Sequence, residues 1–283
     1  MWQTSRFQID LALPRVMGIV NVTPDSFSDG GQHGSTAAAL RHCEQLLQDG
    51  ADILDIGGES TRPGAVPLGL QDELARVMPV VKDALSLGVP VSVDTYKPQV
   101  MRAVLDAGAD IINDIWALRW RDGPNALPAA QVIATHPNCG VCLMHMHLEP
   151  QTMQMQPMQG DVVSQVLLFL EHAAHDLYGL GVEKARILID PGIGFGKTVA
   201  QNFSLLARQT ELLAAGYPLL IGWSRKSSLA GLGAAADSVL STRQRLAPSL
   251  AAALLAVQRG ASVVRVHDVK ETVQVLKLLE AAG

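Results

Sequence analysis

The feature that most constrains the fold is the alternation of short apolar runs with longer segments of helical periodicity. Apolar side chains in the longer segments recur at spacings of three and four, which is typical of helices packed on one face. The apolar runs are short enough to be buried strands, and they comprise residues 16–20, 52–56, 89–93, 110–112, 140–144, 187–189, 218–221 and 262–266. Eight strands alternating with helices, without a linker between them, predict an α/β fold of the (β/α)8 TIM-barrel class.

The segments between these runs have the boundaries that helices prefer. Glycine follows most of them, and glycine is the residue that most readily adopts the left-handed conformation after a helix. The expected helices are residues 35–48, 70–87, 98–107, 160–180, 202–215, 241–259 and 269–282. Gly-Ala stands between helix and strand at Gly50, Gly108 and Gly260, which indicates repeated βα units.

Two segments fall outside this repeat. Residues 9–13 are expected to form a short strand or hairpin before the barrel, and residues 116–137 contain three prolines without a regular pattern. A doubly wound open sheet is the alternative fold, but it would usually have fewer strands and a glycine-rich first turn. Since 283 residues with 48% hydrophobic content can bury one large core, we expect a single domain over residues 1–283, with its core at about 15–281.

Charge and cysteine content exclude several classes of protein. The net charge of −5 and the pI near 5.9 do not indicate a nucleic-acid or membrane surface, and no run has the length of a membrane-spanning helix. The N-terminus lacks the order of a signal peptide. Three cysteines, an odd and low number, predict a cytoplasmic protein without disulfides. Cys139 and Cys142 have redox-motif spacing, but on a strand they point to opposite faces, so we expect buried thiols.

Polar residues occupy the positions where the expected strands end. In a TIM barrel these carboxyl-terminal ends surround the active site. One buried polar residue could be structural, but a full rim of them favours a ligand site, because each is costly without a partner. The rim residues are Asn21, Asp55, Asp94, Asn113, Asp190, Lys226, Arg265 and His267.

Their chemistry indicates two halves of one ligand. Asp94, Asn113 and Asp190 supply oxygens that would accept hydrogen bonds from an N–H-rich heterocycle such as an aminopyrimidine, and Lys226 would donate to a carbonyl or ring nitrogen on it. A second group suits a phosphorylated substituent, and it consists of Asn21, Arg62, Arg265 and His267. Asn21, with nearby carboxylates, could also hold Mg²⁺ through oxygen ligands.

Other catalytic patterns are weaker. No serine or cysteine nucleophile has an evident base, and Lys226 as a Schiff-base lysine is a minor alternative. The glycine-rich residues 190–197 lack P-loop spacing. His145 and His147 form an HxH pair of the kind that binds zinc in barrel hydrolases, but in that class the pair usually lies on the first strand, whereas here it follows the fifth.

Eight phrases, in order from about residue 16 to residue 279, closely resemble the dihydropteroate synthase family. They are GIVNVTPDSFSDGG, DIGGESTRPGA, SVDTYKP, IINDI, LMHM, IDPGIGFGKT, SRKS and RVHDVKET. The resemblance implies a (β/α)8 barrel, usually a homodimer, that joins a dihydropterin diphosphate to 4-aminobenzoate and releases pyrophosphate in folate synthesis. It also implies a sulfonamide target.

The resemblance assigns roles residue by residue. It implies pterin binding by Asp94, Asn113, Asp190 and Lys226, and diphosphate binding by Asn21, Thr61, Arg62, Arg265 and His267, with Asn21 near Mg²⁺. It implies 4-aminobenzoate binding by Thr61, Arg62, Pro63, Phe195, Lys226 and Ser227. The residues expected to carry catalysis are Asn21, Arg62, Asp94, Lys226, Arg265 and His267.

In this family the diphosphate leaves first, and the arylamine attacks the resulting cationic pterin methylene. Such a reaction needs electrostatic stabilisation more than a strong base, so the lack of a nucleophile is expected. We also expect residues 23–31 to close over the site with residues 60–64 after pterin diphosphate binds.

Two alternatives remain. A methyltetrahydrofolate methyltransferase would share Asp94, Asn113 and Asp190 but should lack NVTPDSFSDGG and GGESTRPGA, and both are present. A non-catalytic paralogue should lose basic residues of the site, and all are retained. The chain departs from the family pattern at His147, Trp116, Trp120, Trp223 and Pro248, none of which has an assigned role.

Overall fold

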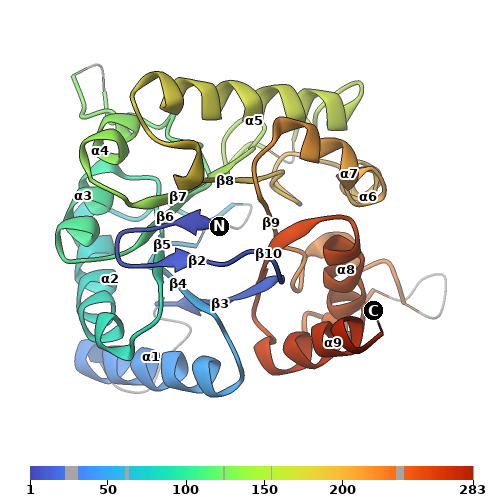
Figure 1. The fold of residues 1–283 in the computed structure, drawn as a ribbon, viewed down its shortest axis with the longest axis horizontal. Helices are drawn as coiled ribbons and strands as arrows, with labels where there is room; N and C mark the ends of the chain where they lie inside the picture. Colours follow the sequence, from blue (N-terminus) through green and yellow to red (C-terminus); the bar gives the residue numbers. More distant parts are fainter. Residues whose placement is uncertain (23–30, 61–63, 124, 154, 234–238, 283) are drawn as a thin grey trace.

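The computed structural model describes residues 1–22, 31–60, 64–123, 125–153, 155–233 and 239–282. Its centre is a closed barrel of parallel strands in the order β10-β3-β4-β5-β6-β7-β8-β9 (Figure 1). The strands are β3 (Arg15–Asn21), β4 (Ile53–Gly57), β5 (Val91–Asp94), β6 (Ile111–Asp114), β7 (Gly140–Met144), β8 (Ile187–Asp190), β9 (Leu219–Ile221) and β10 (Ala261–Val266). The prediction of a (β/α)8 barrel is confirmed, and each expected strand matches one of these.

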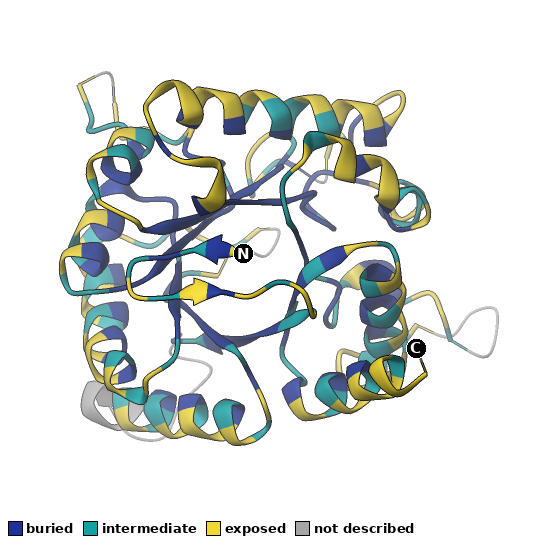
Figure 2. Cartoon of the chain, viewed as in Figure 1, coloured by how far each residue is buried: buried dark blue, intermediate teal, exposed yellow. Residues whose placement is uncertain are grey.

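Helices surround the barrel, with buried faces toward the strands and exposed faces outward (Figure 2). They are α1 (Gly31–Gln48), α2 (Leu70–Ala84), α3 (Pro98–Asp106), α4 (Ala129–Thr135), α5 (Val162–Gly179), α6 (Val199–Ala207), α7 (Gln209–Leu212), α8 (Leu246–Gln258) and α9 (Val269–Ala281). No described helix is both long and apolar enough to cross a membrane.

Three segments differ from what the sequence predicted. The segment 116–137, expected to be irregular, contains the short helix α4, which begins directly after Pro128. The segment 202–215 is divided into α6, α7 and a 3₁₀ turn, and α6 begins earlier because Thr198 and Gln201 form a capping box. The segment 241–259 is helical only from Leu246 after a 3₁₀ turn.

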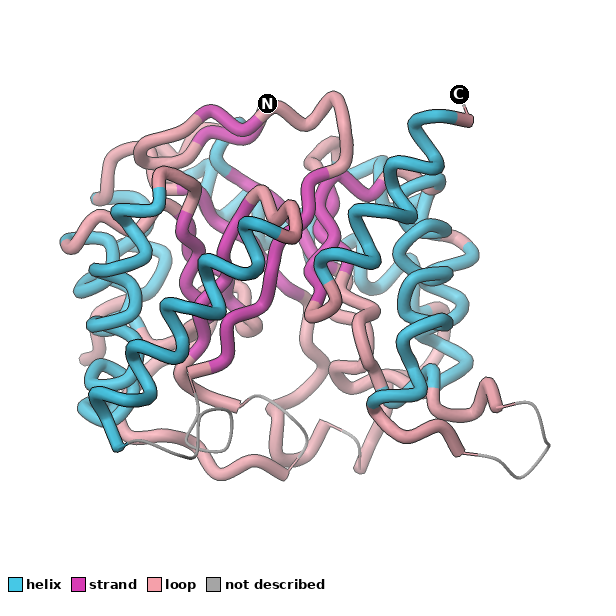
Figure 3. Tube along the Cα trace, turned by 90° about the horizontal axis from the view of Figure 1, so that it is seen from below, coloured by secondary structure: helices cyan, strands magenta, loops and turns pink. Residues whose placement is uncertain are grey.

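A small antiparallel hairpin closes the amino-terminal end of the barrel. It consists of β1 (Trp2–Gln3) and β2 (Gln8–Ile9), and Figure 3 shows it at the opposite end of the strands from the loops that follow β3 to β10. Trp2 is fully buried against an interior layer of apolar side chains that includes Met17, Ile53 and Leu188. The expected N-terminal hairpin is therefore present and covers this end of the barrel as a plug, but its strands are Trp2–Gln3 and Gln8–Ile9, and of the expected residues 9–13 only Ile9 is in a strand.

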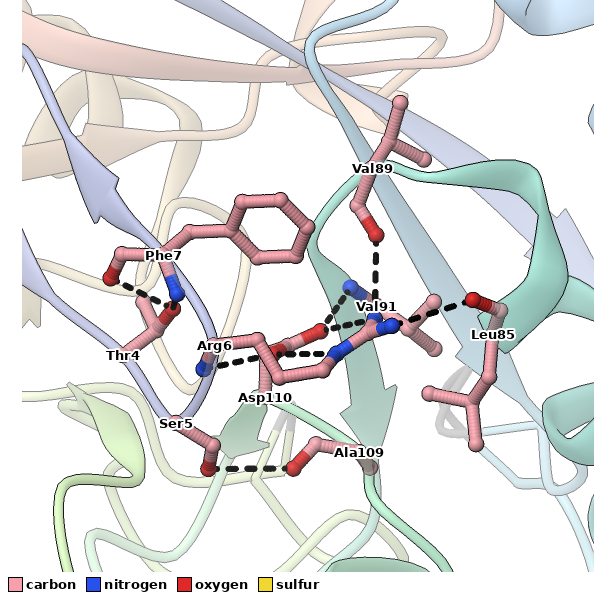
Figure 4. A network of polar contacts seen from close by, with 9 residues as sticks. All are labelled: Thr4, Ser5, Arg6, Phe7, Leu85, Val89, Val91, Ala109 and Asp110. Atoms are coloured by element: carbon pink, nitrogen blue, oxygen red, sulfur yellow. Dashed lines mark hydrogen bonds and ion pairs between the residues drawn. The ribbon is translucent and has the colours of Figure 1, made fainter.

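An ion-pair network fastens the plug to the barrel (Figure 4). The buried carboxylate of Asp110 accepts hydrogen bonds from the Arg6 backbone N–H at 3.1 Å, from its guanidinium at 3.0 and 2.7 Å, and from the Val91 N–H at 2.9 Å. The same guanidinium donates to the carbonyl oxygens of Leu85 and Val89. Asp110 thus joins the hairpin to the start of β5 and of β6.

Removing the plug side chain is expected to destabilise the protein without changing the site at the other end. Trp2→Ala should lower the free energy of unfolding by about 3–5 kcal/mol, the usual cost of deleting a large buried aromatic side chain. The measurement is urea unfolding followed by circular dichroism. Leu13→Ala, which truncates an exposed side chain, is the control. A loss below about 1 kcal/mol in Trp2→Ala would show that the hairpin is not part of the core.

The cysteines are structural. Cys43, Cys139 and Cys142 are free and buried, as predicted, and burial raises the pKa of the Cys43 thiol to about 12. Cys139 Sγ accepts a hydrogen bond from Arg186 at 3.1 Å, inside the layer between barrel and helices. A buried thiol with a raised pKa is a poor nucleophile.

Candidate active site

The strand ends bring most of the predicted residues to one rim. Asn21 at the end of β3 is level with Gly57 of β4, Gly57 is level with Asp94 of β5, and Asp94 is level with Asn113 of β6. Asp190 ends β8. On the closing side of the barrel, Lys226 and Ser227 follow β9, Arg265 lies in β10 and His267 follows it.

Three of the predicted site residues lie outside the part of the chain that the structure describes. Thr61, Arg62 and Pro63 are outside the described residues, as are residues 23–30, so the expected closure of these two loops stays a prediction.

A carboxylate pair and one arginine form the centre of the rim. Arg265 Nε donates to Asp55 Oδ2 at 2.6 Å, and Arg265 Nη2 donates to Asp94 Oδ2 at 2.7 Å. Asp55 also accepts from Ser92 Oγ at 2.6 Å and from Asn113 Nδ2 at 3.2 Å. Asp55 therefore orients one arginine and one amide of the predicted site. The sequence placed Asp55 near a strand end, but it did not indicate that Asp55 would hold both Arg265 and Asn113.

Burial shifts the pKa of the ionisable groups at the rim. It raises the pKa of Asp94 to about 7, against the opposing effect of the Arg265 charge. It also raises the pKa of Asp190, whose Oδ1 accepts from the Gly192 N–H at 2.7 Å. The same desolvation lowers the pKa of Lys226 to about 8. Such opposed shifts among neighbouring groups are typical of functional sites.

The loop after β8 places an aromatic ring beside Lys226. Lys226 Nζ lies 4.5 Å from the centre of the Phe195 ring, in cation–π contact. The loop passes so close to the end of β7 that a Cβ on Gly192 would lie 1.9 Å from the His145 carbonyl oxygen. A Cβ on Gly196 would likewise lie 2.5 Å from the His147 carbonyl oxygen, so close backbone packing requires glycine at both positions.

A buried lysine fixes the shape of this loop. Lys197 Nζ donates to the carbonyl oxygens of Gly192 at 2.9 Å and Phe195 at 3.1 Å, and contacts His145 Nδ1 at 2.9 Å. Burial lowers the pKa of Lys197 to about 7 and that of His145 to about 2. His145 Nδ1 thus faces the Lys197 amino group, an arrangement unsuited to a zinc ligand. Among the described residues, no three His, Cys, Asp or Glu side chains are grouped to hold a metal.

His267 is neutral. Its Nδ1 lies 3.0 Å from Ser224 Oγ, and its backbone N–H donates to the same oxygen at 3.1 Å. Burial and the neighbouring Arg265 lower its pKa to about 3. In the tautomer in which the Ser224 hydroxyl donates to Nδ1, the proton resides on Nε2, and a neutral His267 would contact an anion as an N–H donor.

Arg225 does not share the role of Lys226 beside it. Its guanidinium pairs with Asp268 at 2.5 and 3.0 Å, and its backbone has a positive φ of 58°. This unusual conformation turns the chain between Ser224 and Lys226, so that successive side chains point to different partners.

Comparisons with known proteins agree with this geometry. A family model described as pterin binding enzyme matches residues 17–267. The dihydropteroate synthase of Neisseria meningitidis serogroup C is 48% identical over 286 residues, which cover 100% of this chain and 98% of that protein. The chain belongs to the dihydropteroate synthase family.

Solved structures of the dihydropteroate synthase family have the same fold. The Xanthomonas albilineans dihydropteroate synthase with 4-aminobenzoic acid is 47% identical and superimposes with a TM-score of 0.87, covering 97% of this chain and 94% of that one. The Burkholderia cenocepacia enzyme complexed with 7,8-dihydropteroate is 46% identical with a TM-score of 0.85, covering 99% and 95%. Identity at this level over the full length makes this chain an enzyme of the transferase class.

Proposed function

We propose that this chain is a dihydropteroate synthase. It condenses (7,8-dihydropterin-6-yl)methyl diphosphate with 4-aminobenzoate to give 7,8-dihydropteroate and pyrophosphate. The observation that carries this proposal is the set of Asp94, Asn113, Asp190 and Lys226, of which Asn113 and Asp190 are buried and the other two half-buried, at the strand ends of a barrel whose relative was solved with 7,8-dihydropteroate. Membership of the family and the chemistry of the rim support the same reaction.

The pterin half of the substrate would bind at the acidic part of the rim. Asp94 and Asp190 accept hydrogen bonds from the amino and ring N–H groups, Asn113 contributes its amide, and Lys226 donates to the ring carbonyl or a ring nitrogen. Arg265 holds Asp94 in place beforehand, at 2.7 Å. A carboxylate that is already oriented loses little entropy when the ligand binds.

The diphosphate would bind at the basic and amide part of the rim, through Asn21, Thr61, Arg62, Arg265 and His267. Arg265 is suited to this although it pairs with two carboxylates, because a guanidinium has five N–H donors. His267 would donate from Nε2.

Mg²⁺ fits this part of the site as a partner of the diphosphate. Mg²⁺ usually keeps several waters and takes one or two protein oxygens together with substrate phosphates. The Asn21 amide oxygen is such a donor, at a strand end on the same rim as Asp94. When bound, the ion would neutralise negative charge on the diphosphate.

The reaction breaks the C–O bond between the pterin methylene and the diphosphate, and the electron pair leaves with the diphosphate. The amine nitrogen of 4-aminobenzoate then forms the C–N bond with its lone pair and loses a proton. The carboxylates Asp55, Asp94 and Asp190 favour the cationic pterin, while Arg265 and Arg62 favour the departing anion. The protein needs no covalent nucleophile for either step.

The 4-aminobenzoate would bind against Phe195, with its carboxylate toward Lys226 and Ser227. Thr61, Arg62 and Pro63 would complete the pocket from the β4–α2 connection.

We further propose that residues 1–283 form one domain, that the protein is cytoplasmic, and that it is a homodimer. Exposed leucines on the outer helices, Leu255 of α8 and Leu278 of α9, suit a dimer contact.

Pyrophosphate release tests the proposal. With Mg²⁺, dihydropterin diphosphate and 4-aminobenzoate together, the purified chain should release pyrophosphate, and omission of either substrate should reduce the rate to background. A methyltransferase would instead transfer methyl from methyltetrahydrofolate in the same preparation. A non-catalytic paralogue would bind pterin without releasing pyrophosphate, and that outcome would refute the proposal.

A further inference from the structure

A buried charged cluster lies beside the rim and has no part in the chemistry described above. It consists of Lys97, Glu59 and Glu73, three side chains that are at most 9% exposed. Lys97 Nζ donates to Glu73 Oε2 at 2.6 Å and forms a second short ion pair with Glu59 Oε2. Removing two carboxylates and an ammonium from water is costly, so the cluster needs a reason beyond stability.

The positions of Glu59 and Glu73 in the sequence suggest what the cluster does. Glu59 stands at the start of the connection from β4 to α2, two residues after the last residue of the strand. Glu73 lies in the first turn of α2, at the far end of the same connection. Lys97 therefore joins the two ends of the connection that carries residues 61–63.

The cluster is also tied to the strand that carries the proposed pterin ligand. Lys97 and Thr95 belong to the short link after β5, which ends at Asp94. Thr95 Oγ1 donates to Glu73 Oε1 at 2.6 Å, and Tyr96 OH donates to Glu59 Oε1 at 2.9 Å. Three successive residues after Asp94 thus hold both ends of the β4–α2 connection.

Close packing leaves the start of the connection little freedom. Arg76 of α2 donates to the Gly58 carbonyl oxygen at 3.0 Å, and a Cβ on Gly58 would lie 2.7 Å from Val77. On its other side, Glu59 borders a cavity of about 320 Å³ lined by Tyr96, Lys97 and Trp120 among others. The position of Glu59 is therefore fixed from the barrel side by charge and contact, while the opposite side is open.

We propose that Lys97 is a positioning residue for 4-aminobenzoate binding. By clamping Glu59 and Glu73, it sets the β4–α2 connection relative to Asp94, so that 4-aminobenzoate is held against the bound pterin. This inference rests on the proposed function. It concerns placement of the second substrate and not binding of the first.

The test measures the effect of Lys97 on each of the two substrates separately. In Lys97→Met, the KM for 4-aminobenzoate should rise by about ten- to hundredfold, because misplacement by about 1 Å has effects of this size. The Kd for dihydropterin diphosphate, measured by calorimetry, should change by less than about threefold. Lys97→Arg, which keeps two charged hydrogen bonds to the carboxylates, should recover most of the wild-type KM.

A second variant covers the case in which Lys97→Met does not fold. Glu59→Ala removes one end of the clamp and leaves a neutral Lys97–Glu73 pair, and it should raise the same KM. Asp110→Asn is the matched control, since it weakens a buried ion-pair network at the opposite end of the barrel and should lower the Tm without changing this KM.

The outcomes are distinguishable. If the wild-type chain releases no pyrophosphate, the proposed function fails. If the wild type is active but both clamp variants keep the wild-type KM for 4-aminobenzoate, the positioning role is refuted. An equal loss of affinity for both substrates would also refute it, because the cluster would then be a general support of the rim.

Discussion

Asp94→Ala is expected to weaken binding of the dihydropterin diphosphate by about a hundred- to a thousandfold. Removing one partner of a buried, charged hydrogen bond costs about 2–5 kcal/mol. Asp94 also neutralises one side of Arg265, with which it pairs at 2.7 Å. In the variant this guanidinium keeps its ion pair with Asp55 but loses the one with Asp94. Excess positive charge would then lie where the cationic pterin methylene forms, and kcat should fall with the affinity.

Calorimetric titration of the variant with dihydropterin diphosphate measures this effect directly. Asp52→Ala is the control, because Asp52 lies at the opposite end of β4 and pairs with Arg15 in partial contact with solvent. Circular dichroism should show that both variants are folded. Unchanged pterin affinity in Asp94→Ala would mean that the pterin does not bind at this part of the rim.

Lys226→Met should lower kcat/KM by about a thousandfold, because the lysine is expected to contact both substrates and each charged hydrogen bond contributes about 1.5–3 kcal/mol. The wild type should also lose activity as the pH rises through about 8, the lowered pKa of Lys226. The direction follows from desolvation: burial disfavours the ammonium form, so the proton is lost at a lower pH than in water, and the neutral amine binds a carboxylate poorly.

A pH profile of kcat/KM with Lys226→Arg tests this assignment. Arginine stays protonated throughout, so the alkaline decline near pH 8 should disappear even if the absolute rate is lower. Ser228→Ala is a neighbouring control outside the proposed contacts and should keep the wild-type decline. If the decline persists in Lys226→Arg, another group is responsible for it.

The barrel and its rim could be predicted because both depend on local patterns. Apolar runs of strand length determine β3 to β10, and the residue that ends each strand is read directly from the sequence. Asp94, Asn113 and Asp190 come together because parallel strands of one barrel end at the same edge. The helix α4 was missed because prolines on both sides of a seven-residue segment obscure its periodicity.

Contacts between distant residues could not be predicted in this way. Asp55 holds Arg265 across 210 positions of sequence, and Lys97 joins Glu59 to Glu73 through a turn that has no helical or strand period. The neutral state of His267 depends on burial and on the Arg265 charge, neither of which is local in sequence. A sequence pattern shows which residues are polar, but not which of them neutralise one another.

Direct detection of 7,8-dihydropteroate is the measurement that tests the central claim. The purified chain is incubated with Mg²⁺, dihydropterin diphosphate and 4-aminobenzoate, and product and pyrophosphate are quantified together by mass spectrometry and an enzymatic assay. We predict equal amounts of both products in the wild type, and neither above background in Asp94→Ala. Pyrophosphate without dihydropteroate, or dihydropteroate at the wild-type rate in Asp94→Ala, would contradict the proposed site and reaction.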